Sequence, residues 1–326
     1  KGYNMILVTG AAGFIGSNIV SSLNKKGIHN IIICDWLNHK SKNKNINKLI
    51  YQNIISPEDI FKYLDKNNDI ELVIHMGANS STTETNFRLI YNINTRFTRN
   101  LWKWCTKNKV RFIYASSAAT YGDGSKGFDD SISIVYKPLN IYGLSKYLFD
   151  RYAIKEAKKK NCPPQWVGLK FFNVYGPNEY HKGSMQSVVK HAIDQYNITG
   201  NVKLFKSYND QYKNGQQTRD FIYIDDCISL INWLIDNKNI SGIFNCGTGI
   251  ERSFEDLVNS VFKAINVSPK IKYIEIPENI KHQYQYYTKA NMDKIRKKGY
   301  KIKALSLEKG VHDYVTNYLL SNDQYK

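Results

Sequence analysis

The chain has 326 residues, 42% of them hydrophobic, which is long enough and apolar enough to bury the core of one large domain or two. The formal net charge of +18 could indicate a nucleic-acid partner, but none is expected, because the basic residues are spread along the chain and the densest block, Lys158–Lys160, is short. We expect no membrane partner, because no apolar stretch approaches the about 20 residues of a membrane span. We expect a cytoplasmic protein, because there is no room for a signal peptide before the first predicted strand. The five cysteines lack metal-ligand spacing, so we expect reduced thiols and no metal.

The N-terminal segment carries a nucleotide-binding pattern. Residues 4–9 predict a short buried strand, and the apolar pattern from Phe14 to Leu23 predicts a helix. Between and within them, Gly10, Gly13 and Gly16 recur every third residue. Glycines at this spacing allow a tight turn and a close approach to a pyrophosphate, which then meets the helix N-terminus.

A second predicted strand, Ile31–Cys34, ends at Asp35, about twenty residues past the glycines, where a carboxylate receives a ribose hydroxyl. A glycine turn without a ligand is the alternative, and the ordered succession of strand, turn, helix, strand and acid disfavours it. Asp35 alone favours NAD because it repels a 2′-phosphate, whereas Lys40 or Lys42 could offset that repulsion.

The central part of the chain alternates strand and helix patterns. Strands are predicted at 71–76, 111–116 and 166–172, helices at 86–107 and 141–160, and further strand edges of the same domain at 218–226 and 241–247. This alternation predicts an α/β fold, a Rossmann-type doubly wound parallel sheet with right-handed crossovers. The expected division is a dinucleotide-binding domain of residues 1–173 plus 218–248 and a smaller α/β substrate-binding domain of residues 174–217 plus 249–326. Residues 207–217 are polar and turn-rich, which predicts a surface loop.

Three residues form a candidate proton-handling centre. Tyr142 and Lys146 lie four residues apart, hence on one helical face, and Ser117 follows the strand predicted at 111–116. A phenol has a reference pKa of about 10, which a nearby ammonium lowers. Tyr142 would then take an alcohol proton while hydride leaves for a nicotinamide, and Ser117 would hydrogen-bond the same oxygen. The four-residue spacing of Tyr142 and Lys146 is weak evidence by itself, because a chain with 24 Tyr contains such pairs by chance. The pair gains weight because it follows a dinucleotide-binding signature.

Several motifs add a family resemblance. Thr9–Gly16, His75–Ala78, Ser116–Gly122 and Tyr142–Lys146 resemble the extended short-chain dehydrogenase/reductases. Within that superfamily, four further features resemble the ADP-L-glycero-D-manno-heptose 6-epimerases of lipopolysaccharide core synthesis: Asn79–Glu84, Lys137–Tyr142, Phe172–Pro177, and His181–Ser187 followed by His191. The resemblance runs from residue 4 to about residue 320, and the stretch around Lys182 is its most specific part.

The resemblance implies a chemistry. Members of this family oxidise C6 of the heptose transiently to a ketone with tightly bound NADP and return the hydride to the other face; NAD is the alternative cofactor here. The resemblance assigns Tyr142 to one epimer and Lys182 to the other, and Lys146 to the ribose hydroxyls and to lowering the pKa of Tyr142. Without it, Lys182 would be interpreted as a solvated surface lysine. It also implies a homo-oligomer, a pentamer in the family.

The remaining site residues are each assigned from the family resemblance, one position at a time. The expected cofactor contacts are Gly10, Gly13, Phe14, Ile15, Gly16, Asp35, Trp36, Lys42, Met76, Gly77, Ala78, Asn94, Lys146 and Val174. The expected ADP-sugar contacts are Asn173, Ser184, His191, Phe205, Arg219 and Tyr284. Arg219 can engage a diphosphate bidentately, and its alternative is an ion pair with Asp220. His75 is interpreted as structural, which is also the alternative for His191.

Some positions depart from the family, and other functions stay open. Trp36 and Met76 stand where the family commonly has Asn and an acid, and a family lysine falls near Pro57. A UDP-hexose 4-epimerase shares the Ser-Tyr-Lys centre but has no need of Lys182. A 4,6-dehydratase needs an acid beside Ser117, where residues 118–120 are Ala-Ala-Thr. A non-catalytic nucleotide sensor is the remaining class, and such a protein has no need to keep both the tyrosine and the lysine.

Overall fold

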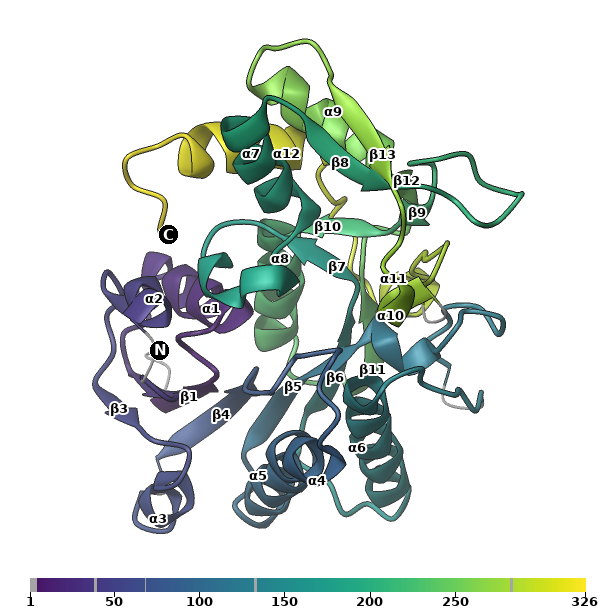
Figure 1. Cartoon of the computed structure of the whole chain (residues 1–326). Coiled ribbons are helices and arrows are strands. Elements are labelled where there is room, and N and C mark those ends of the chain that lie inside the picture. Colours follow the sequence, from purple (N-terminus) through teal and green to yellow (C-terminus); the bar gives the residue numbers. More distant parts are fainter. Residues whose placement is uncertain (1–4, 38–39, 68, 132–133, 282–283) are drawn as a thin grey trace.

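The computed structural model describes residues 5–37, 40–67, 69–131, 134–281 and 284–326. Within these ranges, seven parallel strands form one sheet in the order β11-β6-β5-β4-β1-β2-β3 (Figure 1). The strands are β1 (Met5–Thr9), β2 (Ile31–Cys34), β3 (Asn53–Ile55), β4 (Ile70–His75), β5 (Arg111–Ser117), β6 (Trp166–Phe171) and β11 (Gly242–Cys246). The sheet confirms the predicted Rossmann-type fold. Residue 4 of the first predicted strand lies outside the described residues.

Both faces of the sheet are buried, because a parallel sheet carries its crossover helices on both sides. Successive strand residues point to opposite faces, so Ile6 and Val8 join one core while Leu7 joins the other. The first core lies under α1 (Phe14–Lys25) and α8 (Ile224–Asp236). The second lies under α3 (Ile60–Leu64), α5 (Phe97–Lys107) and α6 (Ile141–Lys158). Figure 1 shows α5 and α6 together on this second face.

The helix predicted at 86–107 is interrupted. It consists of α4 (Phe87–Ile90), a π-helical stretch (Tyr91–Arg96) and α5. The helix predicted at 141–160 is α6, which ends at Lys158. It begins where Asn140 caps it, since the Asn140 side chain accepts a hydrogen bond from Gly143 N at 2.8 Å. The cap places Tyr142 in the first turn of α6, at the carboxyl end of β5.

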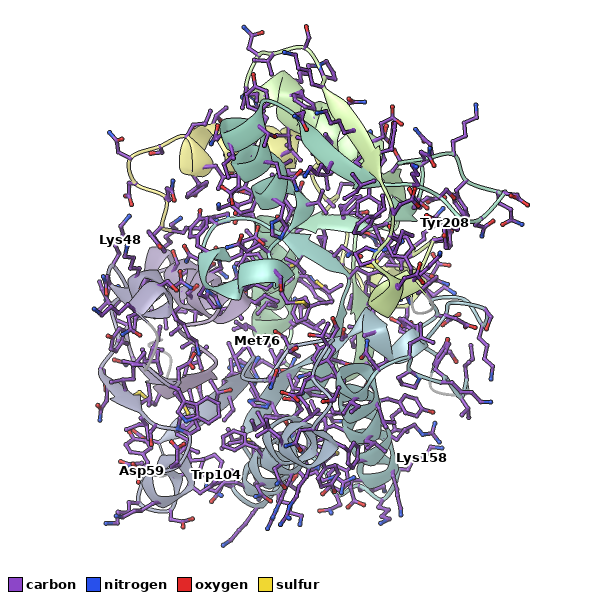
Figure 2. All side chains as sticks on the ribbon, in the orientation of Figure 1. Lys48, Asp59, Met76, Trp104, Lys158 and Tyr208 are labelled. Carbon is purple, nitrogen blue, oxygen red and sulfur yellow. The ribbon has the colours of Figure 1, made fainter. Side chains whose placement is uncertain are left out.

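A smaller unit lies over the carboxyl ends of the central strands (Figure 1). Its helices are α7 (Val188–Thr199), α9 (Phe254–Ala264) and α12 (Leu307–Tyr314), and its parallel strand pair is β8 (Val202–Phe205) with β13 (Ile271–Ile274). The shorter elements are α2 (Lys40–Asn43), α10 (Glu278–Lys281), α11 (Asp293–Lys297), the 3-10 segments Lys44–Ile46, Ala118–Tyr121 and Tyr180–Met185, and the π-helical Val315–Leu319. The predicted loop 207–217 lies at the surface, with Tyr208 exposed (Figure 2).

The segment 218–226, predicted to hold strand edges of the first domain, contains two short strands. Residues 218–226 do not continue the main sheet: β9 (Thr218–Arg219) pairs with β12 (Arg252–Ser253), and β10 (Phe221–Tyr223) pairs with β7 (Asn173–Tyr175). The chain leaves the sheet after β6, so that β7 has a new partner, and Ile224 already begins α8. The hydrophobic pattern indicates extended backbone here and carries no information about its partner.

The segment from 320 to 326 returns to the first unit and contacts the region before α7. Lys48 forms an ion pair with Asp323 (Figure 2 labels Lys48), and Tyr180 donates to Gln324 O at 2.7 Å. The Lys326 amide donates to Asn178 Oδ1 at 3.0 Å. Through the C-terminal segment, these bonds connect Asn178 and Tyr180 to the first unit. Among the described residues, the helices are all too short or too polar to span a lipid bilayer.

Candidate active site

A cavity of about 940 Å³ lies at the carboxyl ends of β1, β4 and β5, where parallel α/β sheets bind their ligands. Met76, which follows β4, lies between the sheet and the smaller unit (Figure 2). The predicted residues that line the cavity are Gly10, Gly13, Phe14, Ile15, Gly16, Asp35, Trp36, Lys42, Met76, Gly77, Ala78, Ser117, Tyr142, Lys146, Asn173, Val174 and Lys182. Asn94, Ser184, His191, Phe205, Arg219 and Tyr284 lie outside its lining.

The glycine turn is shaped for a closely approaching ligand. Gly10 has a φ of 66°, and a Cβ there would stand 2.5 Å from Gly77 N. A Cβ on Gly16 would overlap the carbonyl oxygen of Gly10 and lie 2.9 Å from Ala11 Cα. Gly13 is the N-cap of α1, so backbone N–H groups of the first turn face the cavity without a side-chain cap. These features fit a dinucleotide pyrophosphate at the helix N-terminus.

Asp35 lies at the far end of the same cavity. Its carboxylate accepts hydrogen bonds from Ala12 N at 2.9 Å and from Trp36 N at 2.8 Å, and it forms an ion pair with Lys42 on α2. The indole of Trp36 donates to Glu58 at 2.6 Å. The ammonium of Lys42 therefore offsets the negative charge of the Asp35 carboxylate.

Tyr142, Ser117 and Lys146 come together where β5 meets α6. Burial raises the pKa of the Tyr142 phenol, and a hydrogen bond with Ser117 opposes that rise. Lys146 Nζ donates to Ala115 O at 2.8 Å, and burial lowers its pKa to about 8, against the opposing charge of Asp150. Lys146 is expected to lower the pKa of Tyr142. In the structure the contact that lowers this pKa comes from Ser117, and the Lys146 ammonium is directed to a carbonyl near the end of β5.

Lys182 lines the same cavity from a different element. It lies in the 3-10 segment Tyr180–Met185, and its Nζ stands 5.2 Å from the centre of the Phe14 ring. Burial lowers the pKa of Lys182, and Glu179 opposes that shift. The interpretation as a solvated surface lysine is wrong, because the ammonium contacts an aromatic ring at the start of α1.

Phe205, Arg219 and Tyr284 form a separate cluster at the smaller unit. The Arg219 guanidinium lies 5.5 Å from the Tyr284 ring and 5.4 Å from the ring of Phe254, which lines the cavity. The rings of Phe205 and Tyr284 meet edge to face at 6.0 Å. The cluster joins the cavity through Phe254, and it presents a cation flanked by aromatic faces.

Arg219 is held by backbone carbonyls. Its guanidinium donates to Thr218 O at 2.9 Å and to Gln285 O. The alternative, an ion pair with Asp220, does not describe the arrangement found. The Asp220 carboxylate instead accepts hydrogen bonds from three backbone N–H groups, those of Thr248 at 2.7 Å, Gly249 at 2.9 Å and Ala290 at 3.0 Å.

Three other predicted polar residues have mainly structural contacts. The Asn94 amide donates to Asn79 O at 2.9 Å and Ser145 Oγ at 3.0 Å, so it holds the loop after β4 rather than facing the cavity. His191 Nε2 lies 3.4 Å from Ser184 O. His75 is buried between Thr9 Oγ1 at 2.5 Å and Thr98 Oγ1 at 2.8 Å, and burial lowers its pKa to about 3, so the ring is neutral.

Sequence reasoning missed some cavity-lining residues. Ser81, Thr82 and Gln186 lie inside motifs that the sequence had singled out, so their motif membership was the available signal. Phe254 also lines the cavity. Its sequence context indicates only the start of a helix, since Ser253 caps α9 immediately before it. The lining of a cavity by Phe254 depends on how α9 packs against the first unit.

Comparisons with known proteins give consistent matches. A family model described as the NAD dependent epimerase/dehydratase family matches residues 6–247. A relative from Fusobacterium nucleatum subsp. nucleatum, named ADP-L-glycero-D-manno-heptose-6-epimerase, is 46% identical and aligns over 98% of this chain and 100% of its own length. Relatives of the same name from Nitratidesulfovibrio vulgaris and Brachyspira hyodysenteriae are 44% and 42% identical, covering 98% and 95% of this chain and 100% and 96% of their own.

Solved structures agree with this. The Helicobacter pylori ADP-L-glycero-D-manno-heptose-6-epimerase superposes with a TM-score of 0.78 at 28% identity over 96% of each chain. A UDP-N-acetylglucosamine 4-epimerase from Methanobrevibacter ruminantium superposes with a TM-score of 0.81 at 21% identity, covering 97% of this chain and 98% of its own. At that identity the second likeness shows the fold alone.

Proposed function

The chain belongs to the NAD dependent epimerase/dehydratase family, with the ADP-L-glycero-D-manno-heptose-6-epimerases as its curated relatives, and we propose that it interconverts the two C6 epimers of ADP-glycero-D-manno-heptose. The reaction supplies a precursor of the lipopolysaccharide core. C6 is not activated for loss of its hydrogen as a proton. A bound nicotinamide supplies the hydride acceptor and then the hydride donor, so that C6 passes through a ketone.

The observation that carries this proposal is that two candidate bases, supplied by two different elements, line one cavity. Tyr142 enters from α6 in the first unit, and Lys182 enters from the 3-10 segment against Phe14. The C6 hydroxyl points in different directions in the two epimers, so each epimer requires its own acid/base group. A UDP-hexose 4-epimerase turns its 4-keto sugar about the diphosphate linkage, so that one base serves both epimers and Lys182 would have no task.

The surrounding residues divide the remaining work. Ser117 orients the reacting oxygen beside Tyr142, whose proton exchange it assists through their hydrogen bond. Lys182 is the acid/base group for the other epimer, and burial lowers its pKa, against the opposing charge of Glu179. Arg219, flanked by Phe205 and Tyr284, holds the diphosphate and nucleoside. Asn173 contacts the sugar from the cavity lining, and the family resemblance adds Ser184 and His191, which lie outside that lining.

We propose NADP as the cofactor, on the strength of the Asp35–Lys42 pair. Lys42→Gln is expected to weaken NADP by about 10–100-fold, since a charged hydrogen bond to phosphate contributes about 1.5–3 kcal/mol. NAD, which lacks the 2′-phosphate, should keep its affinity within about twofold. Titrating nucleotide-free enzyme with each cofactor measures both constants, and exposed Lys40→Gln on the same helix is the control. Equal weakening of NAD and NADP would contradict a phosphate contact.

The substrate is tested by incubating the enzyme separately with each ADP-heptose epimer and with UDP-galactose. Chromatography should show interconversion of the ADP-heptoses and no change in UDP-galactose. The physical reason is the position of Lys182, which serves an inverted C6 hydroxyl and no atom of a 4-keto hexose. Turnover of UDP-galactose alone would replace this proposal with a UDP-hexose 4-epimerase.

A further inference from the structure

Asn45 connects two parts of the site that are far apart in sequence. It lies in the 3-10 segment Lys44–Ile46 with 1% of its surface exposed. Its Nδ2 donates to Ala12 O at 2.9 Å and to Asn178 O at 3.0 Å, and stands 3.2 Å from His181 Nδ1. Ala12 belongs to the glycine turn, and His181 immediately precedes Lys182. One buried amide therefore bridges the cofactor turn and the segment of the second base.

The orientation of this amide is determined by its neighbours. The group that faces the Ala12 and Asn178 carbonyls must be the NH₂, because an amide oxygen there would oppose two other oxygens. His181 Nδ1 is then an acceptor, which puts the ring proton of a neutral His181 on Nε2. Two N–H groups serve three acceptors, so one of them is shared. The arrangement holds His181 against the glycine turn.

The same turn also contacts Lys182 directly. Phe14, two residues after Ala12, lies under the Lys182 ammonium at 5.2 Å. The backbone turns immediately after Lys182, where Gly183 has a φ of 54° and a ψ of −125°. Before Lys182, Asn45 holds the Asn178 carbonyl and the His181 ring. Tyr142 depends on a different scaffold, the Asn140 cap of α6.

We propose that Asn45 is a positioning residue for Lys182, acting through His181 and Asn178, and that it serves the Lys182 half of the reaction and not the Tyr142 half. Asn45 touches no reacting atom. The inference rests on the proposed two-base function. Its consequence is a selective one: losing the Asn45 amide should disturb one base and leave the other in place.

The test needs an assay that reads each base separately. An ADP-sugar with an aldehyde at C6 allows dismutation, in which one hydrated aldehyde loses hydride to the nicotinamide and becomes the acid, and a second aldehyde takes that hydride and becomes the alcohol. Two aldehydes and one water give one acid and one alcohol. Tyr142→Phe enzyme must perform both steps with Lys182, and Lys182→Met enzyme must perform both with Tyr142.

Asn45→Ala is then added to each parent. In the Tyr142→Phe parent the dismutation rate per bound dinucleotide should fall about 10–100-fold, as expected when a catalytic group is misplaced by about an ångström. In the Lys182→Met parent the rate should stay within about twofold. Asn45→Asp, which keeps the shape and removes the donor, should reproduce the effect if Asn45→Ala fails to fold. Asn43→Ala is the matched control, because that nearby amide donates to Leu37 O at 3.1 Å within its own segment.

The outcomes separate this inference from the function on which it rests. If both parents are inert, or if the variant lacking both bases still dismutates, the two-base assignment fails before Asn45 is considered. If the parents behave as expected and the Asn45 variants slow both equally, or slow neither, the positioning role is overturned. The dismutation rate of each variant is divided by its measured dinucleotide content, and thermal unfolding shows whether the variant is folded.

Discussion

Tyr142→Phe and Lys182→Met are each expected to lower epimerisation by about 10²–10⁴-fold in both directions. Each variant loses the acid/base group for one epimer, and interconversion requires both. Both variants should still carry dinucleotide, because neither side chain is assigned to anchor it. The measurement is the initial rate from each pure epimer, followed chromatographically, with the dinucleotide released on denaturation quantified alongside.

Dismutation of the C6 aldehyde distinguishes two bases from one. Each single variant should still dismutate, since one base remains, whereas the variant lacking both should not. Lys190→Met is the matched control for Lys182, because Lys190 lies on α7 and forms an ion pair with Asp194 at 2.5 Å. Epimerisation by Lys182→Met at the rate of the unmodified enzyme would mean that Lys182 takes no part in the chemistry.

Gly16→Ala is expected to purify without dinucleotide. The added methyl group would overlap the Gly10 carbonyl and press on Ala11, so the turn and the start of α1 must move apart. Overpacking of this kind costs about 1–3 kcal/mol, and here it falls on the N–H groups that meet the pyrophosphate, so binding should weaken at least about 10–100-fold. Nucleotide released on denaturation and calorimetric titration with NADP and NAD measure the loss.

Gly27→Ala is the control for this effect. Gly27 also has a positive φ, 76°, but a Cβ there meets nothing within 4 Å. The control should lose some thermal stability through backbone strain and keep its dinucleotide. A Gly16→Ala enzyme that purified with a full complement of dinucleotide would contradict the assignment of this turn to the pyrophosphate.

The local part of the site could be predicted from sequence because its signals are local. The glycine turn, Asp35 and the Tyr142–Lys146 pair each depend on a few neighbouring residues in a strand, turn or helix. The structure brings them together because β1, β2 and β5 end at the same edge of one parallel sheet. That convergence follows from the alternation of strand and helix patterns.

The contributions from the smaller unit could not be predicted in the same way. Lys182 lies in a short 3-10 segment that contacts Phe14 and Asn45, both of which are distant in sequence. The pairing of β10 with β7 is likewise a choice of partner that no hydrophobic period encodes. Family resemblance identified Lys182, and the physical reason for its position is visible only in the contacts.

The most direct test of the central claim follows the hydrogen at C6. ADP-D-glycero-D-manno-heptose carrying deuterium at C6 is incubated with the enzyme in ordinary water, and the epimeric product is analysed by mass spectrometry. Transient oxidation to a ketone, with the same hydride returned inside a closed site, predicts that the L-glycero product keeps its deuterium. A product that carries solvent hydrogen at C6 would show that C6 was inverted by proton abstraction, which would contradict transient oxidation by a bound nicotinamide.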